Sequence, residues 1–151
     1  MKKKDWGNAT WYLFHTLAQK IKPEYASVEL PILFNHIESI CNNLPCPDCR
    51  NHAREIVLKA NKRQVTASKE NLINYLWSFH NSVNQRTGKP FYPKQSLDMY
   101  NRAITPNVVN HFIYVMRQSA NSVGLMTNTV QRKIYIAKFI DYINNNKHKY
   151  N

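Results

Sequence analysis

The chain has 151 residues, about the length of one domain, and its hydrophobic content of 43% excludes wholesale disorder. It carries 21 Lys and Arg residues against 9 Asp and Glu residues, a formal net charge of +12 that raises the question of a polyanionic partner. Because the lysines are scattered, we expect a solvated basic surface and consider nucleic-acid binding unlikely as the main function. No stretch approaches the roughly 18 apolar residues of a membrane span, and MKKKDWGNATW lacks the apolar core of a secretory signal.

Helical periodicity runs through the first half of the chain. A first helix is predicted after Asn8 and before Pro23, with a buried stripe made by Trp11, Phe14, His15, Ala18 and Ile21. A second helix is predicted to begin at Ser27 as its N-cap, with an inward face made by Val28, Ile32, Phe34, Ile37 and Ile40. Both helices would therefore contribute to one core.

The rest of the chain also predicts helices. A third begins at the CPDC stretch, a fourth spans Ser68 to Thr87 and is ended by Gly88-Lys89-Pro90, and a short fifth covers Lys94 to Arg102. Two more amphipathic segments, 108–118 and 130–143, are joined by residues 122–128, and the last eight residues read as a polar tail. The fold class is thus all-α: a four-helix bundle with a short fifth helix in residues 1–104, followed by a C-terminal helical extension in residues 105–151.

The CPDC stretch holds two of the three cysteines, and three kinds of chemistry compete for it. Cys46, Cys49 and His52 could be three ligands of a zinc site, with Cys41 or His36 as a strained fourth. Alternatively, Cys46 and Cys49 form a redox dithiol, because the N-terminus of a helix favours a thiolate. They could also be buried thiols without chemistry. Spacing alone leaves these three alternatives open.

The stretch LWSFHNSVNQRTGKP is the second informative one. On a helix His80, Asn81 and Asn84 share one side, with Trp77 and Val83 adjacent. Such a surface suits a flat heteroaromatic ligand. The alternative is a helix with one satisfied histidine and exposed asparagines, and the residues alone favour this alternative.

Three motifs in order resemble the ERV/ALR family of FAD-linked sulfhydryl oxidases. They are WGNATWYLFHTLA at residues 6–18, CPDCRNH at 46–52, and HNSVN followed by GKP at 80–90. The resemblance covers roughly residues 5–102 and implies a compact helical bundle that holds FAD, often as a homodimer. The small number of cysteines resembles the viral branch of the family, in large cytoplasmic DNA viruses of the mimivirus kind. It implies a location in the host cytoplasm, at the virus factory, or in the virion.

By motif match, the resemblance implies Cys46 and Cys49 as the catalytic pair and no metal. The implied FAD-binding residues are Gly7, Asn8, Thr10, Trp11, His15, Trp77, His80, Asn81, Val83, Asn84, Lys89 and Tyr100. Trp11 and His15 are expected against the flavin and its adenosine half, Lys89 at the pyrophosphate, and Tyr100 closing the adenine site. His80, Asn81, Val83 and Asn84 are expected on the adenine–ribose side.

The resemblance also implies a mechanism. A substrate thiolate attacks Cys46, the residue nearer solvent, and Cys49, next to the flavin, passes the electrons on; O2 is the final acceptor and becomes hydrogen peroxide. The substrate would be a dithiol protein, expected to be a small redox protein with its own CxxC motif, because this chain has no second cysteine pair to serve as a shuttle.

The chain departs from the family pattern at several positions. Asn8 stands where many members have arginine, and Trp77 and the cysteine-free stretch 91–96 stand where members often carry a structural disulfide. Cys41 is expected to be a core thiol, with an intermolecular bridge as the alternative. Residues 105–151 lie outside the resemblance. They could pack on the bundle or extend a dimer interface, or they could form a docking surface for the redox partner or for virion components. Of these alternatives we favour packing in a dimer or against a partner. The role of His52 stays open.

Overall fold

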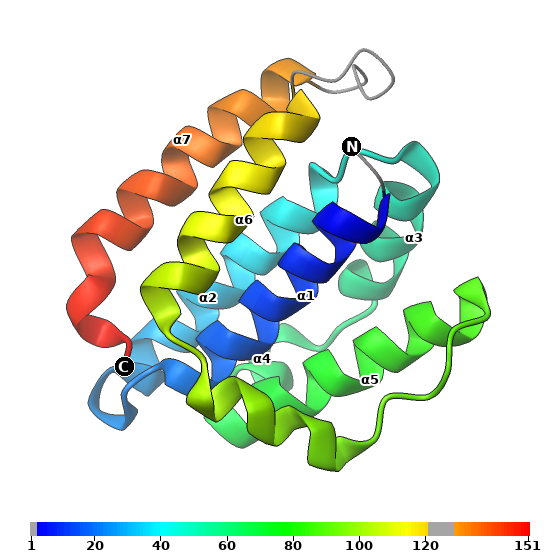
Figure 1. The fold of residues 1–151 in the computed structure, drawn as a ribbon. Coiled ribbons are helices and arrows are strands. Elements are labelled where there is room, and N and C mark those ends of the chain that lie inside the picture. The colour runs from blue at the N-terminus through cyan, green and yellow to red at the C-terminus, as the bar shows by residue number, and fades with distance from the viewer. Residues whose placement is uncertain (1–2, 121–128) are drawn as a thin grey trace.

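The computed structural model describes residues 3–120 and 129–151, and its elements are helices (Figure 1). In chain order they are α1 (Lys3–Lys20), α2 (Pro23–Asn42), α3 (Pro47–Leu58), α4 (Lys62–Val65), α5 (Lys69–Thr87), the 3-10 helix η1 (Lys94–Arg102), α6 (Thr105–Ala120), α7 (Thr129–Asn146) and the 3-10 helix η3 (Lys147–Lys149). The only β pairing among the described residues is an isolated bridge between Ile21 and Tyr150. The prediction of an all-α fold is therefore confirmed.

Helices α1 and α2 lie between two groups of helices (Figure 1). On one side α6 packs along α1 and α7 packs against α2, and on the other side α5 packs on α1 and α3 packs on α2. One continuous hydrophobic core joins these layers, and its large side chains come from both parts of the chain: Phe14, Phe34, Phe79, Phe112 and Phe139. The boundary expected after residue 104 falls at the start of α6, and the core continues across it.

The prediction for the second helix is wrong in its start and in two inward residues. The helix begins at Pro23, where the fixed φ of proline suits the first helical turn, and Lys22 is its extended N-cap. Val28 is 69% exposed and Ile32 is 38% exposed. Residues two apart point to opposite sides of a helix, so Ile32 could not share a face with Phe34. The buried face is made by Glu29, Leu30, Leu33, Phe34, Ile37, Ile40 and Cys41.

The helix that carries HNSVN forms where it was predicted. Ser68 is the N-cap of α5, and its hydroxyl accepts a hydrogen bond from the backbone N–H of Asn71 at 3.0 Å. Gly88 ends the helix in the left-handed region at φ 72°, a conformation that favours glycine. The short turn α4 was not predicted, because four residues are too few to show helical periodicity.

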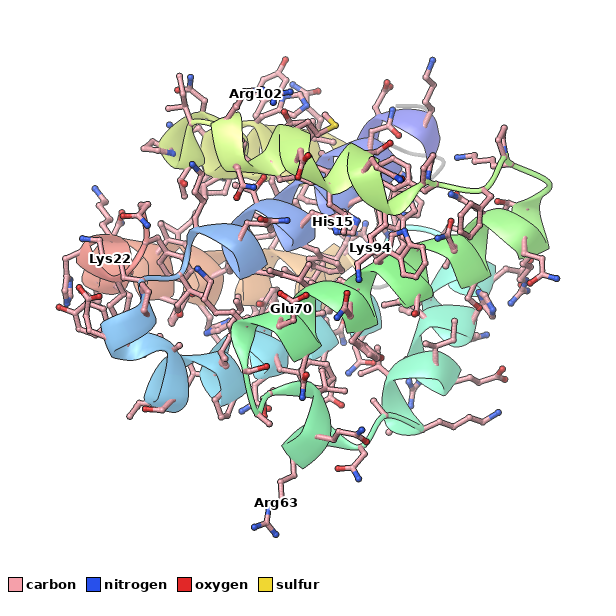
Figure 2. All side chains as sticks on the ribbon, turned by 90° about the horizontal axis from the view of Figure 1, so that it is seen from below. His15, Lys22, Arg63, Glu70, Lys94 and Arg102 are labelled. Carbon is pink, nitrogen blue, oxygen red and sulfur yellow. The ribbon has the colours of Figure 1, made fainter. Side chains whose placement is uncertain are left out.

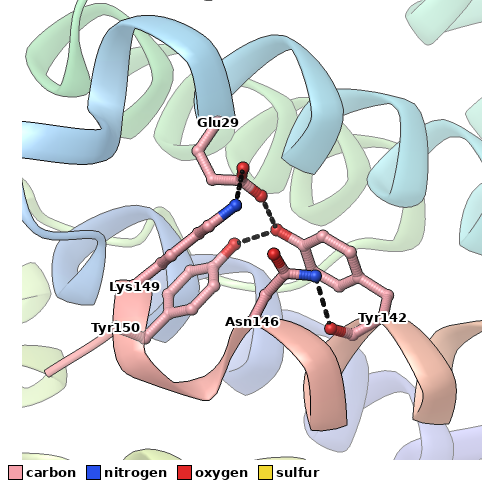
Figure 3. Close-up of polar contacts among 5 residues, drawn as sticks. All are labelled: Glu29, Tyr142, Asn146, Lys149 and Tyr150. Carbon is pink, nitrogen blue, oxygen red and sulfur yellow. Dashed lines mark hydrogen bonds and ion pairs between the residues drawn. The ribbon is translucent and has the colours of Figure 1, made fainter.

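The last residues do not form a free polar tail, so that prediction is wrong. The carboxylate of Glu29 is buried in α2, where it pairs with Lys149 Nζ at 2.8 Å and accepts a hydrogen bond from Tyr142 Oη at 2.6 Å (Figure 3). Tyr142 Oη also lies 2.7 Å from Tyr150 Oη. The backbone N–H of Lys22 donates to Lys149 O at 2.8 Å. These contacts hold the end of the chain against α2 and the turn before it. The predicted link between the last two helices, residues 122–128, lies outside the described residues.

The positive charge is spread over the surface. In Figure 2, Lys22, Arg63 and Arg102 lie at three separate edges of the molecule, whereas His15 lies near its middle. Such a distribution agrees with the solvated basic surface expected from the scattered lysines. Within the described residues, no helix combines the length and the apolar character needed to cross a membrane.

Candidate active site

The two cysteines of CPDC meet at the N-terminus of α3. Cys46 is the N-cap of the helix, and its sulfur accepts a hydrogen bond from the backbone N–H of Cys49 at 3.3 Å. The two Sγ atoms lie 2.6 Å apart, so little movement separates them from a disulfide bond of about 2.05 Å. Arg50 donates to Leu44 O at 3.0 Å and fixes the loop that leads into the motif. The local geometry therefore suits reversible disulfide chemistry.

A cavity of about 670 Å³ lies between α1, α3, α5 and η1. Of the residues expected to bind FAD, the cavity is lined by Gly7, Asn8, Thr10, Trp11, His80, Val83, Asn84, Lys89 and Tyr100. Cys49 also lines the cavity, and Cys46 is not part of the lining. The CPDC motif thus presents one sulfur to the cavity and keeps the other outside it.

Two histidines from different helices lie at one cavity wall: His80 lines the cavity, and His15 lies behind it. His15 Nε2 lies 2.9 Å from His80 Nδ1, and the Trp11 ring stacks on His80 with centroids 4.2 Å apart and an interplanar angle of 7°. Burial, followed by the charge of His80, lowers the pKa of His15 to about 3. Burial, followed by the charge of Lys89, lowers the pKa of His80 to about 4. Both rings are therefore neutral at pH 7, and one donates the shared proton while the other accepts it.

The lowered pKa values of His15 and His80 predict that the folded protein loses stability in acid. An unfolded histidine titrates near 6.5, so between pH 6.5 and pH 4 the unfolded state binds more protons and the folded state is penalised. We expect His15, which is 1% exposed, to account for about 3 kcal/mol of that loss at most. Thermal unfolding of the ligand-free protein across this range will measure it.

The matched comparison is between two histidine substitutions. His15→Gln removes the buried titrating group, so its melting temperature should depend less steeply on pH than that of the unchanged protein. His111→Gln removes an exposed histidine of α6 and should leave the dependence unchanged. Equal slopes for all three proteins would contradict the role given to the pair.

Three residues expected at the cofactor do not line the cavity. His15 lies behind His80. Trp77 and Asn81 instead bind the main chain of Tyr92, to which Trp77 Nε1 donates at 2.8 Å and Asn81 Nδ2 at 3.1 Å. These three side chains instead contact His80 and Tyr92, which do line the cavity.

Sequence reasoning also missed several cavity residues, namely Trp6, Tyr12, Phe14, Cys41, Leu44, Asp48, Ala53, Phe79, Arg86, Pro90, Phe91, Tyr92 and Met99. Tyr92 follows GKP in a loop, where no helical periodicity marks a residue as facing inward. Arg86 precedes GKP by two residues on α5, and its charge beside Lys89 was an available signal.

His52 and Cys41 both lie against the cavity. The pKa of His52 is lowered by burial and by the charge of Arg86, with a smaller opposing effect of Glu55. Cys41 is 2% exposed, and burial raises the pKa of its thiol, as expected for a core thiol. Within residues 3–120 and 129–151, no three His, Cys, Asp or Glu side chains are grouped to hold a metal ion. In the described part of the chain, Cys46 and Cys49 are therefore not grouped with further side chains that could complete a zinc site.

Comparisons with known proteins agree with this geometry. The Erv1 / Alr family model matches residues 8–102. A putative FAD-linked sulfhydryl oxidase, 096R of Invertebrate iridescent virus 3, is 34% identical over 85 residues, which are 56% of this chain and 57% of that protein. FAD-linked sulfhydryl oxidase ERV1 of Oryza sativa subsp. japonica is 34% identical over 96 residues, 64% of this chain and 48% of the relative.

A probable FAD-linked sulfhydryl oxidase, R368 of Acanthamoeba polyphaga mimivirus, is 30% identical over 112 residues, 70% of this chain and 76% of that protein. The first two relatives are matched over only about half of their own length. No solved structure matches the chain significantly. The family match spans most of the chain and includes both the cysteine pair and the cavity helices, and the chain therefore belongs to the Erv1 / Alr family.

Proposed function

We propose that this protein is an FAD-dependent thiol oxidase that forms disulfide bonds in dithiol proteins. One observation supports it above the others: the N-terminus of α3 places two sulfurs 2.6 Å apart, and Cys49, but not Cys46, lines the 670 Å³ cavity. A disulfide at that position can exchange with an external thiol through Cys46 and react inside the cavity through Cys49. The names of the relatives, FAD-linked sulfhydryl oxidases, point to the same activity.

The residues of the cavity fit FAD. The cavity volume of about 670 Å³ lies in the range of roughly 300–1,000 Å³ that is usual for cofactor sites. Trp11 and His80 offer flat aromatic surfaces, and Arg86 and Lys89 offer charges for a pyrophosphate. A Cβ placed on Gly7 would meet nothing within 4 Å apart from its chain neighbours and the backbone of α1, so space remains beside this helix.

The cavity residues have different expected roles. Cys49 would face the reactive ring of the cofactor, and Lys89 and Arg86 offer positive charges for the pyrophosphate. His80, Val83 and Asn84 would face the adenosine part from α5. Asn8, Thr10 and Tyr100 would complete the wall; the hydroxyl of Thr10 donates to Trp6 O at 2.7 Å, which leaves its methyl group for packing.

The chain's own residues account for the thiol chemistry. A substrate thiolate attacks Cys46 Sγ of the oxidised pair, a mixed disulfide forms, and Cys49 leaves as a thiolate that faces the cavity. The second substrate thiol then attacks the mixed disulfide, which releases the oxidised substrate and returns Cys46 to its reduced form. When bound, FAD supplies a two-electron acceptor that can deliver the electron pair of the reduced cysteines to O2 as hydrogen peroxide.

The cysteines of the chain support a proposal for the partner. Cys41 is buried and the chain has only two others, so no cysteine is left to carry electrons from a distant substrate. We therefore propose an external dithiol protein, a small redox protein with its own CxxC motif. Because several relatives are viral, we also propose that the protein acts in the host cytoplasm, at the virus factory or in the virion. A homodimer stays a prediction.

The function is tested on the purified protein with two measurements. We expect flavin absorption bands that remain with the protein through gel filtration, and oxygen consumption with formation of hydrogen peroxide when dithiothreitol is added. A colourless protein that consumes no oxygen after incubation with FAD would refute the proposal. Gel filtration with light scattering reports the oligomeric state in the same run.

A further inference from the structure

Two side chains of α5 fasten the loop that follows this helix. Asn81 makes a pair of hydrogen bonds with the main chain of Tyr92: its Nδ2 donates to Tyr92 O at 3.1 Å, and its Oδ1 accepts from Tyr92 N at 2.7 Å. Trp77, one turn earlier, donates from Nε1 to the same Tyr92 O at 2.8 Å. Together these three hydrogen bonds satisfy both the backbone N–H and the backbone C=O of Tyr92. We call residues 88–93 the Tyr92 loop.

The indole of Trp77 is itself held on the loop side. The Phe91 ring packs edge-on against it at 5.7 Å and 83°, and Lys94 Nζ lies 5.9 Å from its ring centre. Both partners belong to the Tyr92 loop or to the residue that follows it. Trp77 is therefore oriented by the loop it fastens, so that the hydrogen bond and the aromatic contact support each other.

On its other side, the Tyr92 loop forms part of the cavity. Lys89, Pro90, Phe91 and Tyr92 all line it. The Tyr92 ring stacks on His80 at 4.9 Å and 25°, and its hydroxyl lies 3.0 Å from the hydroxyl of Tyr100. Tyr92 is thus bound through its main chain to Trp77 and Asn81. Through its side chain it contacts His80 and Tyr100, two residues expected to bind the cofactor.

We propose that Trp77 and Asn81 are positioning residues that clasp the Tyr92 loop against the cavity, and that opening of this clasp controls how fast FAD leaves. The inference rests on the proposed binding of FAD in the cavity. It assigns Trp77 and Asn81 a role that acts through Tyr92 and not by contact with the cofactor. An unfastened loop would free Phe91 and Tyr92 together, so the cofactor would lose that rim of its site at once, while Lys89 stays held by its backbone N–H, which donates to Asn84 O at 2.8 Å.

The experiment measures the release of FAD from the loaded, full-length protein after dilution, followed by the rise in flavin fluorescence. Trp77→Phe keeps a ring against Phe91 and removes the Nε1 donor. We expect release about fivefold faster, the factor that corresponds to the loss of one neutral hydrogen bond. Asn81→Asp removes the Nδ2 donor and places a carboxylate beside Tyr92 O, so we expect release at least about tenfold faster.

The pH dependence of release separates positioning from a general loss of structure. A protonated carboxyl can donate a hydrogen bond, so release from Asn81→Asp should slow toward that of the unchanged protein as the pH falls toward about 4. Trp77→Phe introduces no titrating group and should show no such recovery. Both rates are taken relative to the unchanged protein at the same pH.

Asn71→Asp is the matched control. Asn71 also lies on α5, and its Nδ2 donates to the main-chain oxygen of Gln64 in α4 at 2.8 Å; neither residue lines the cavity. Release from Asn71→Asp should stay within about twofold of the unchanged protein. The inference is overturned if Trp77→Phe and Asn81→Asp retain FAD normally, or if the control releases it as fast as they do. An unchanged protein that binds no FAD would instead refute the proposed function.

Discussion

Replacing Cys49 with serine is expected to abolish thiol oxidation while the protein still folds and binds FAD. A serine hydroxyl cannot form a disulfide with Cys46, so the step that transfers electrons into the cavity is lost. We expect oxygen consumption with dithiothreitol to fall by at least about a thousandfold, to the background rate. Cys46→Ser should be equally inactive, because each sulfur is half of the same reactive bond. Turnover retained by either variant would contradict the mechanism.

The two inactive variants should nevertheless differ in the reactivity of the remaining sulfur. In Cys49→Ser, Cys46 lies outside the cavity lining and should react readily with a bulky aromatic disulfide reagent. In Cys46→Ser, Cys49 faces the cavity, so bound FAD should shield it and slow the reaction. Burial raises the pKa of Cys41, which should therefore contribute little to the signal in either variant. Equal rates would contradict the division between a substrate-facing and a cavity-facing sulfur.

The helices themselves could be predicted because their signals are local. Ser68 and Gly88 bound α5 through hydrogen bonds and backbone angles that involve only neighbouring residues. The start of α2 was predicted wrongly because two local signals compete there. The N-cap preference of serine suggested Ser27, but Pro23, four residues earlier, also suits the start of a helix, and α2 begins at Pro23. Local preferences decide between such starts only weakly, and packing of α2 against the core selects one of them.

The site was predictable in its motifs and not in its contacts. Cys49, Trp11 and Lys89, which the resemblance names as site residues, all line the cavity. The position of Trp77 in a motif could not show that its indole reaches a carbonyl 15 residues further along the chain. The same holds for the contact of His15 with His80 across 65 residues. Hydrogen bonds between distant residues depend on how the helices pack, and periodicity within one helix carries no information about that.

The extension was the least predictable part, because the three family motifs and the match to the family model end before residue 105. Its amphipathic pattern predicted two helices but could not identify the surface they cover. In the structure α6 packs along α1, and Phe112 of α6 meets Phe139 of α7 edge-to-face at 5.6 Å and 76°. The aromatic pair belongs to the same cluster as Phe14 of α1. The extension thus completes the core of the bundle that holds the cavity.

Phe112→Ala is therefore expected to destabilise the whole protein and not only the extension. The side chain is 0% exposed, and truncation of a buried phenylalanine typically costs about 3–5 kcal/mol. For a chain of this length that corresponds to a fall in melting temperature of roughly 6–20 °C. Far-UV circular dichroism and flavin fluorescence should report one coincident transition, since a single core unfolds as a unit.

Tyr114→Ala is the control on the same helix. Tyr114 is 62% exposed, so its loss should change the free energy of unfolding by no more than about 0.5 kcal/mol. Two separate transitions for Phe112→Ala, with the flavin signal unchanged in the first, would show that α6 and α7 unfold independently of the bundle. Because α6 lies against α1, which carries Trp11 and His15, we expect the opposite: loss of Phe112 should also weaken the retention of FAD on heating.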